Sequence, residues 1–195
     1  MIIAITPEEM ITGETETINQ MFQEGLDLLH IRKPLISKNG LEKFISGINA
    51  SFHSRLVLHS HYDVGSNFNI SRIHFREADR QSGLFRKYAD NMIISTSVHS
   101  ISTYNALGSE WEYSLISPVF PSISKKGYGK GTRILEDIRH RGHPDVGLIA
   151  LGGINENNIH TALDAGADGV ALLGAIWESD QPINVFKKCR MNALL

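Results

Sequence analysis

Short apolar runs rich in β-branched residues recur along the whole chain, and they constrain its fold more than any other feature. The runs show no clean alternation of polar and apolar positions, which is typical of strands buried on both faces of a parallel sheet. Helix-like stretches, with apolar residues three and four positions apart, lie between most of them. The eight expected strands are Ile2–Ile5, Leu28–Ile31, Leu56–Leu58, Ile73–Phe75, Met92–Ser95, Tyr113–Ile116, Val146–Ala150 and Val170–Leu173.

This order of elements predicts a single α/β domain over residues 1–195, built as a (β/α)8 TIM barrel. No proline- or serine-rich linker interrupts the chain, although its 195 residues are few for a fold that typically takes ~250. An open, doubly wound sheet is the alternative, and the count of eight strands favours the closed barrel. The expected helices are Glu14–Glu24, Leu41–Ile48, Tyr62–Asn67, Ile134–Ile138, Ile159–Leu163 and Ile183–Met191.

Composition excludes several classes of function. The net charge of −2 and the pI near 6.5 lack the basic surplus that binding to nucleic acid or to a membrane surface requires. The single cysteine, Cys189, excludes an internal disulfide and a cysteine-based metal cluster. No apolar run approaches the ~20 residues of a membrane span, and the N-terminus lacks the basic region of a signal peptide. We therefore expect a cytoplasmic protein.

Glycine-containing turns follow the last two expected strands. Gly152 and Gly153 come after the seventh strand, while Leu173 and Gly174 close the eighth. Glycine lets backbone N–H groups approach an anion closely, and the N-terminus of a following helix adds partial positive charge. Glycine also marks ordinary turns. Two such turns at the end of a chain of alternating strands and helices nevertheless predict a phosphate site at strands 7 and 8.

Active sites of (β/α)8 barrels lie at the C-terminal ends of the strands. A single histidine there is more often structural than catalytic, and His74, inside the fourth expected strand, has the structural interpretation. Several polar residues on one rim are harder to explain in that way. The candidates are His30, Arg32, Lys33, His59, Ser60, His61, Asp79, Ser97, His99, Ser100 and Ser117.

The stretch 122–131 is rich in glycine and lysine, and it predicts a loop that closes over an anionic substrate. Its candidate substrate-binding residues are Ser122, Ser124 and Lys125. A solvated surface loop is the alternative. No histidine–glutamate or paired-aspartate spacing indicates a dedicated metal site.

Together these motifs resemble the thiamin phosphate synthase superfamily, and within it the TenI-type thiazole tautomerases. The resemblance runs the whole length and is weakest around residues 60–90. The segments that carry it are His30-Ile31-Arg32, Ser97-Val98-His99-Ser100, Ser117-Pro118-Val119-Phe120, Lys125-Lys126-Gly127, Ala150-Leu151-Gly152-Gly153-Ile154 and Ala165-Gly166-Ala167-Asp168-Gly169-Val170.

The synthase branch implies joining a pyrimidine diphosphate to thiazole phosphate with Mg²⁺. Its Asn-Asp pair after strand 3 is replaced here by His59-Ser60, although Asp79 matches its further aspartate. The residue after strand 8 is Gly174 instead of the family's serine. Because Mg²⁺ prefers carboxylate oxygens, these departures weaken the synthase interpretation.

The tautomerase branch implies a proton shift on a carboxylated thiazole phosphate, with no cofactor or metal. His99 stands at the position of the catalytic histidine, and histidine titrates near neutral pH. Arg32 could hold the substrate carboxylate, and the remaining substrate-binding set is His30, His59, Ser97, Ser122, Ser124, Lys125, Gly152, Gly153, Leu173 and Gly174. Superfamily members often form dimers, so the resemblance implies a homodimer.

Two further functions stay open. A non-catalytic regulator that keeps the phosphate pocket would also have lost the metal carboxylates. A phosphosugar aldolase or isomerase ranks last, because no expected strand contains the lysine that such enzymes use.

Overall fold

Eight parallel strands close into one barrel in chain order, with β8 paired to β1. The structure is a computed structural model that describes residues 1–121, 127 and 129–193. The strands are β1 (Ile2–Ile5), β2 (Leu28–Ile31), β3 (Leu56–Leu58), β4 (Arg72–Phe75), β5 (Ile93–Val98), β6 (Trp111–Ile116), β7 (Gly147–Leu151) and β8 (Gly169–Leu172). The closed (β/α)8 barrel is confirmed, and the open-sheet alternative is wrong.

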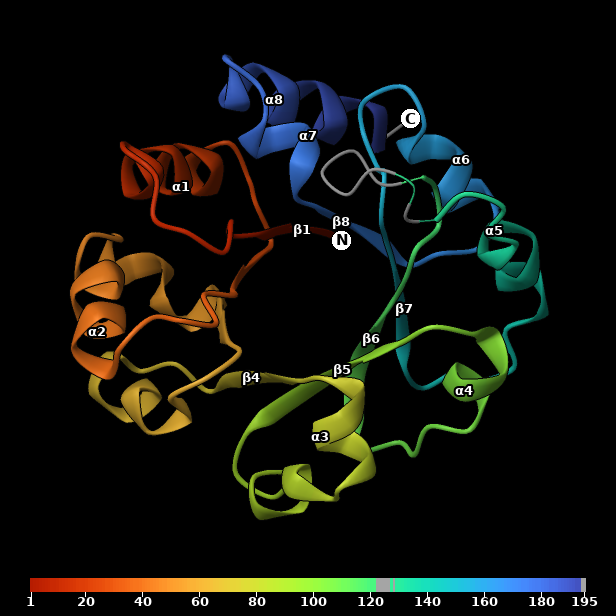
Figure 1. Ribbon diagram of the computed structural model, residues 1–195, viewed down its shortest axis with the longest axis horizontal. Coiled ribbons are helices and arrows are strands. Elements are labelled where there is room, and N and C mark those ends of the chain that lie inside the picture. The colour runs from red at the N-terminus through yellow and green to blue at the C-terminus, as the bar shows by residue number, and fades with distance from the viewer. Residues whose placement is uncertain (122–126, 128, 194–195) are drawn as a thin grey trace.

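Helices surround the strands in chain order (Figure 1). The α-helices are α1 (Glu14–Gln23), α2 (Lys38–Ser46), α3 (Glu77–Gln81), α4 (Ile101–Asn105), α5 (Ile134–Asp137), α6 (Ile159–Asp164), α7 (Gly174–Trp177) and α8 (Pro182–Ala193). Short 3₁₀ segments are η1 (Ala50–Arg55), η2 (Tyr62–Phe68), η3 (Leu84–Lys87) and η4 (Ile138–His140). The helix expected at Tyr62–Asn67 is therefore a 3₁₀ segment.

The start of α2 shows how local sequence sets a boundary. The apolar spacing predicts a helix from Leu41, but the helix begins three positions earlier, at Lys38. The side chain of Ser37 accepts a hydrogen bond from the N–H of Gly40, which satisfies one of the free donors of the first turn. The predicted buried face is confirmed at Leu41, Phe44 and Ile45.

Buried apolar side chains form two separate layers. The larger layer packs between the strands and the helices. The smaller lies inside the barrel and consists of Ile3, Ile5, Leu28, Val57, Tyr113, Leu115, Ile149 and Ala171. Two buried histidines, His30 and His74, accompany this inner layer, so the interior changes from apolar to polar along the barrel axis. No helix in the described part of the chain is long and apolar enough to cross a membrane.

Candidate functional site

Three histidines from neighbouring strands meet inside the barrel. His30 lies in β2, His74 lies in β4, and His59 directly follows β3. The Nδ1 atom of His30 is 2.9 Å from the Nε2 atom of His59. The rings of His59 and His74 stack with centroids 4.5 Å apart, and His30 meets His74 edge-on. Of the three, only His59 is partly exposed.

Hydroxyl groups contact ring nitrogens of His30 and His74 and orient the two rings. The Nε2 atom of His30 lies 2.6 Å from the hydroxyl of Tyr113 in β6. His74 contacts Ser95 through Nδ1 and Ser97 through Nε2, each at 2.9 Å. Both serines belong to β5, so residues of four strands combine in one network with His59, which follows β3.

The triad is uncharged at neutral pH. Burial lowers the pKa of His30 and His59 well below the usual 6.5, and it lowers the pKa of His74 to about 3. Nearby positive charge acts in the same direction, because Arg32 lowers the pKa of both His59 and His74. Each neutral ring therefore has one nitrogen lone pair and no positive charge.

The two cations that follow β2 have different environments. Arg32 forms an ion pair with Glu8 at 2.6 Å, and its side chain is 39% exposed, within reach of an incoming anion. Lys33 is buried and pairs with Glu14 of α1 at 2.9 Å. It also donates to the backbone carbonyls of Pro7 and Glu9. Lys33 therefore anchors the β1–α1 loop and is not a rim residue.

The single expected metal carboxylate is already engaged. Asp79 accepts two hydrogen bonds from Arg76, at 2.9 and 3.2 Å. The position of the second carboxylate is occupied by Ser60, which is partly exposed. The described residues thus lack the pair of carboxylates that the resemblance to a synthase implies.

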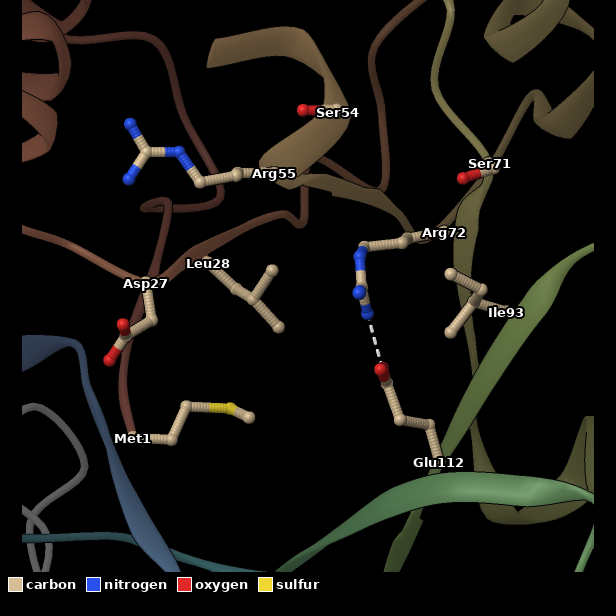
Figure 2. Close-up of a pocket in the computed structure, with 9 residues that line it drawn as sticks. All are labelled: Met1, Asp27, Leu28, Ser54, Arg55, Ser71, Arg72, Ile93 and Glu112. Atoms are coloured by element: carbon tan, nitrogen blue, oxygen red, sulfur yellow. Dashed lines mark hydrogen bonds and ion pairs between the residues drawn. The ribbon is translucent and has the colours of Figure 1, made fainter.

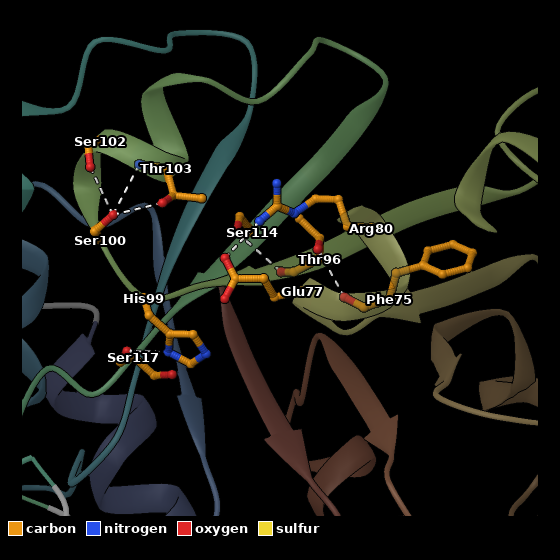
Figure 3. A network of polar contacts seen from close by, with 10 residues as sticks. All are labelled: Phe75, Glu77, Arg80, Thr96, His99, Ser100, Ser102, Thr103, Ser114 and Ser117. Atoms are coloured by element: carbon orange, nitrogen blue, oxygen red, sulfur yellow. Dashed lines mark hydrogen bonds and ion pairs between the residues drawn. The ribbon is translucent and has the colours of Figure 1, made fainter. Parts of the chain in front are cut away.

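His99 lies at the end of β5, exposed and beside the β6 terminus (Figure 3). Its Nδ1 atom is 2.9 Å from the carbonyl oxygen of Ser117. The neighbouring Ser100, not His99, caps α4 by accepting a hydrogen bond from the N–H of Thr103. The side chain of His99 is thus oriented by one contact.

The glycine pair after β7 has the backbone that the phosphate prediction requires. Gly152 and Gly153 have φ values of 103° and 65°, in the left-handed region that favours glycine. A Cβ at Gly153 would lie 2.3 Å from the carbonyl oxygen of Pro121. Leu173 and Gly174 form the β8–α7 junction, and all four residues are partly exposed. Close packing against the β6–α5 loop explains the glycines as well as an anion would, and anion binding stays a prediction.

Ser122, Ser124 and Lys125 lie outside the described residues.

A pocket also lies at the opposite, N-terminal end of the strands (Figure 2). Arg72 and Glu112 form an ion pair there. Asp27 also lines the pocket, and its carboxylate accepts from the N–H of Ile2. That end of a (β/α)8 barrel is associated with stability, whereas chemistry occurs at the C-terminal end. The histidine triad and His99 therefore define the candidate site.

Sequence reasoning missed how the triad assembles. His74 lies in its strand and is buried, as predicted, but it also contacts two of the rim candidates, His30 and His59, and so belongs to the site. Tyr113 was not a candidate at all. The available signal was strand register, since His74 pairs with Ser95 of β5 and both point into the barrel.

These features define a (β/α)8-barrel protein with a polar C-terminal mouth. A family model described as thiamine monophosphate synthase matches residues 2–176, and the chain belongs to this TMP-TENI family. The resemblance to the superfamily is thereby confirmed.

Individual relatives carry the synthase name. A thiamine-phosphate synthase of Lysinibacillus sphaericus is 30% identical over 142 residues, which cover 70% of this chain and 66% of that protein. One from Listeria monocytogenes is 41% identical over 107 residues, covering 52% of this chain and 49% of that protein. The chain thus spans about half to two thirds of the length of these relatives.

Solved structures extend the similarity to the whole chain. A crystal structure described as thiamine phosphate pyrophosphorylase from Bacteroides thetaiotaomicron is 28% identical, with a TM-score of 0.79, and the match covers 100% of this chain and 98% of that one. A similarly described protein from Pyrococcus furiosus has a TM-score of 0.82 at 18% identity, covering 99% of this chain and 95% of that one, and supports the fold alone.

Proposed function

We propose that the chain is an enzyme of thiamine biosynthesis and acts as a thiamine-phosphate synthase, joining a pyrimidine diphosphate to thiazole phosphate. The observation that carries this proposal is the full-length similarity to a structure bearing that activity's name, at 28% identity. The curated relatives support the same activity. This reverses the order of the two branches that the residue pattern alone favoured.

The charges at the mouth suit two anionic substrates. Arg32 and Arg76 both lie near enough to His59 to lower its pKa, so two guanidinium groups flank the β2–β4 side of the mouth. The Gly152-Gly153 turn and the β8–α7 junction lie on the other side. A diphosphate held by the arginines and a phosphate held by these backbone groups would place the two rings between them, which is the positioning that a joining reaction needs.

Magnesium is the group that the synthase branch implies. When bound, it would neutralise the diphosphate leaving group. Ser60 offers no carboxylate, and both oxygens of Asp79 accept from Arg76. The described residues therefore do not form the paired-carboxylate site. In this proposal Arg32 and Arg76 neutralise the diphosphate, which takes the place of their present partners Glu8 and Asp79.

A specific observation favours thiazole tautomerase as the second candidate. His99 is exposed, and its contact with Ser117 leaves Nε2 available to move a proton. The tautomerase requires only a phosphate anchor and such an acid–base group, and it tolerates the missing carboxylate.

Assays of both reactions on the purified full chain test the proposal. We expect thiamin phosphate to form from the pyrimidine diphosphate and thiazole phosphate, and Ser60→Asp to raise the Mg²⁺ dependence of this reaction where the matched Ser60→Asn does not. Isomerisation of carboxylated thiazole phosphate without condensation, unaffected by EDTA, would assign the tautomerase instead. Binding of thiazole phosphate with neither turnover would assign the non-catalytic regulator.

A further inference from the structure

We propose that His30, His59 and His74 bind one divalent transition-metal ion of the zinc class inside the barrel mouth. Each histidine offers one ring nitrogen, and the three nitrogen atoms lie within 4.8 Å of one another. The inference goes beyond the proposed function, because it concerns metal binding and not the reaction.

Small ring movements would complete such a site. In a tetrahedral zinc site with metal–nitrogen bonds of ~2.0–2.1 Å, neighbouring nitrogens are roughly 3.3 Å apart. The separations here exceed this by at most about 1.5 Å, a gap that side-chain rotation can close. His59 follows its strand and is only partly buried, so it has the most freedom to rotate.

The outer contacts of the triad are those that orient metal ligands. A ligating histidine usually donates its other N–H to an oxygen acceptor, which fixes the ring. If the Nδ1 atom of His30 binds the ion, its Nε2–H donates to the Tyr113 hydroxyl at 2.6 Å. If the Nε2 atom of His74 binds, it gives up its contact with Ser97, and its Nδ1–H donates to Ser95 at 2.9 Å.

The three imidazole nitrogens favour one class of metal ion over another. Three uncharged imidazoles suit Zn²⁺, Co²⁺, Ni²⁺ or Cu²⁺, whereas Mg²⁺ prefers oxygen ligands. Three protein ligands leave a fourth position open, as in catalytic zinc sites. His59 is the partly exposed member, so this position would face the mouth. The arginines that act electrostatically on the triad, Arg32, Arg72 and Arg76, are each paired with a carboxylate, which reduces their repulsion of the ion.

Metal titration of the chelator-treated full chain tests the site, with Co²⁺ as the spectroscopic probe and Zn²⁺ as competitor. We expect one Co²⁺ per chain with the intense visible absorption of a four-coordinate ion, displaced by one Zn²⁺. His59→Ala should weaken binding by more than the ~10–100-fold that loss of an outer contact typically costs. Tyr113→Phe, which keeps the ring packing, should weaken it by about that 10–100-fold.

His140→Ala is the matched control, because His140 is an exposed histidine in η4. It should bind Co²⁺ as the unmodified chain does, and circular dichroism would verify that each variant is folded. Absence of stoichiometric binding by the unmodified chain would overturn the proposal. Equal binding by the His59→Ala and His140→Ala variants would overturn it too, since the metal would then lie elsewhere. Neither result depends on which reaction the protein catalyses.

Discussion

The Nδ1 atom of His99 lies 2.9 Å from the carbonyl oxygen of Ser117, linking the ends of β5 and β6. A carbonyl oxygen can only accept, so Nδ1 carries the hydrogen and Nε2 of the neutral ring keeps its lone pair. In the neutral ring, Nε2 is therefore the nitrogen that can accept a proton. This relationship gives His99 its candidate role as a proton carrier.

We expect His99→Ala to lower thiazole tautomerisation by ~10²–10⁴-fold, the usual contribution of general acid–base catalysis. Substrate affinity should change only a few-fold, because the phosphate anchor is separate. Steady-state kinetics would measure both, with His140→Ala as the exposed-histidine control. Near-normal turnover in His99→Ala, together with an inactive His30 or His59 variant, would move the proton carrier to the β2–β3 side.

The Gly152-Gly153 turn should bind the phosphate of the substrate. We expect Gly153→Ala to weaken binding of thiazole phosphate and also to lower stability, because the new Cβ would lie 2.3 Å from the Pro121 carbonyl oxygen. Gly13→Ala is the matched control: Gly13 also has a positive φ, 74°, but open space where a Cβ would lie. That control should lose only the ~1–2 kcal/mol of left-handed backbone. Calorimetric binding and thermal unfolding would separate the two effects. Unchanged phosphate affinity in Gly153→Ala would place the anion elsewhere.

The strands were predicted well because most contain a short run of apolar or β-branched residues, and all pair with their neighbours in chain order. The short helices α3, α4 and α7 have four or five residues, too few to show a 3.6-residue period. The network around the triad was missed for a different reason, because its members are far apart in the sequence. Tyr113, which contacts His30, is 83 positions from it, and only barrel closure and strand register bring the two together.

Contacts between residues far apart in the sequence also decide the role of Lys33, which its position after the second strand alone had placed on the rim. Its ammonium group pairs with Glu14 behind the β1–α1 loop, and both side chains are 1% exposed. Burial raises the pKa of Glu14, and the contact with Lys33 opposes this shift. The pair is therefore structural, and we expect its loss to lower the stability of the fold and not the affinity for substrate.

Removing one member of this buried pair should destabilise the fold strongly. We expect Glu14→Gln to lower the free energy of unfolding by ~3–5 kcal/mol, since it leaves the Lys33 charge without its partner. The exposed pair Arg133–Glu136 is the control, with side chains 79% and 71% exposed. Glu136→Gln should change stability by less than ~1 kcal/mol. Urea unfolding would measure both. Similar effects of the two substitutions would contradict the structural role of the buried pair.

The histidine triad predicts a pH dependence of stability. The folded pKa of His74, about 3, lies below the ordinary 6.5. Between these values the unfolded chain binds a proton that the folded chain does not, so stability falls as pH drops below about 6.5. For His74 alone, the loss between pH 8 and pH 5 is about 2 kcal/mol. His30 and His59, whose pKa values are also lowered, act in the same direction.

His74→Gln should remove the His74 share of this dependence, because glutamine stays uncharged in both states. Urea unfolding from pH 5 to pH 8 would measure it on metal-free protein, since a bound ion would add its own pH dependence. The stability difference between the unmodified chain and the variant should shrink by about 2 kcal/mol as pH falls to 5. The exposed control His140→Gln should follow the unmodified chain at every pH. Parallel curves for the unmodified chain and His74→Gln would mean that His74 is protonated in the folded protein, contrary to its burial against two serine hydroxyls.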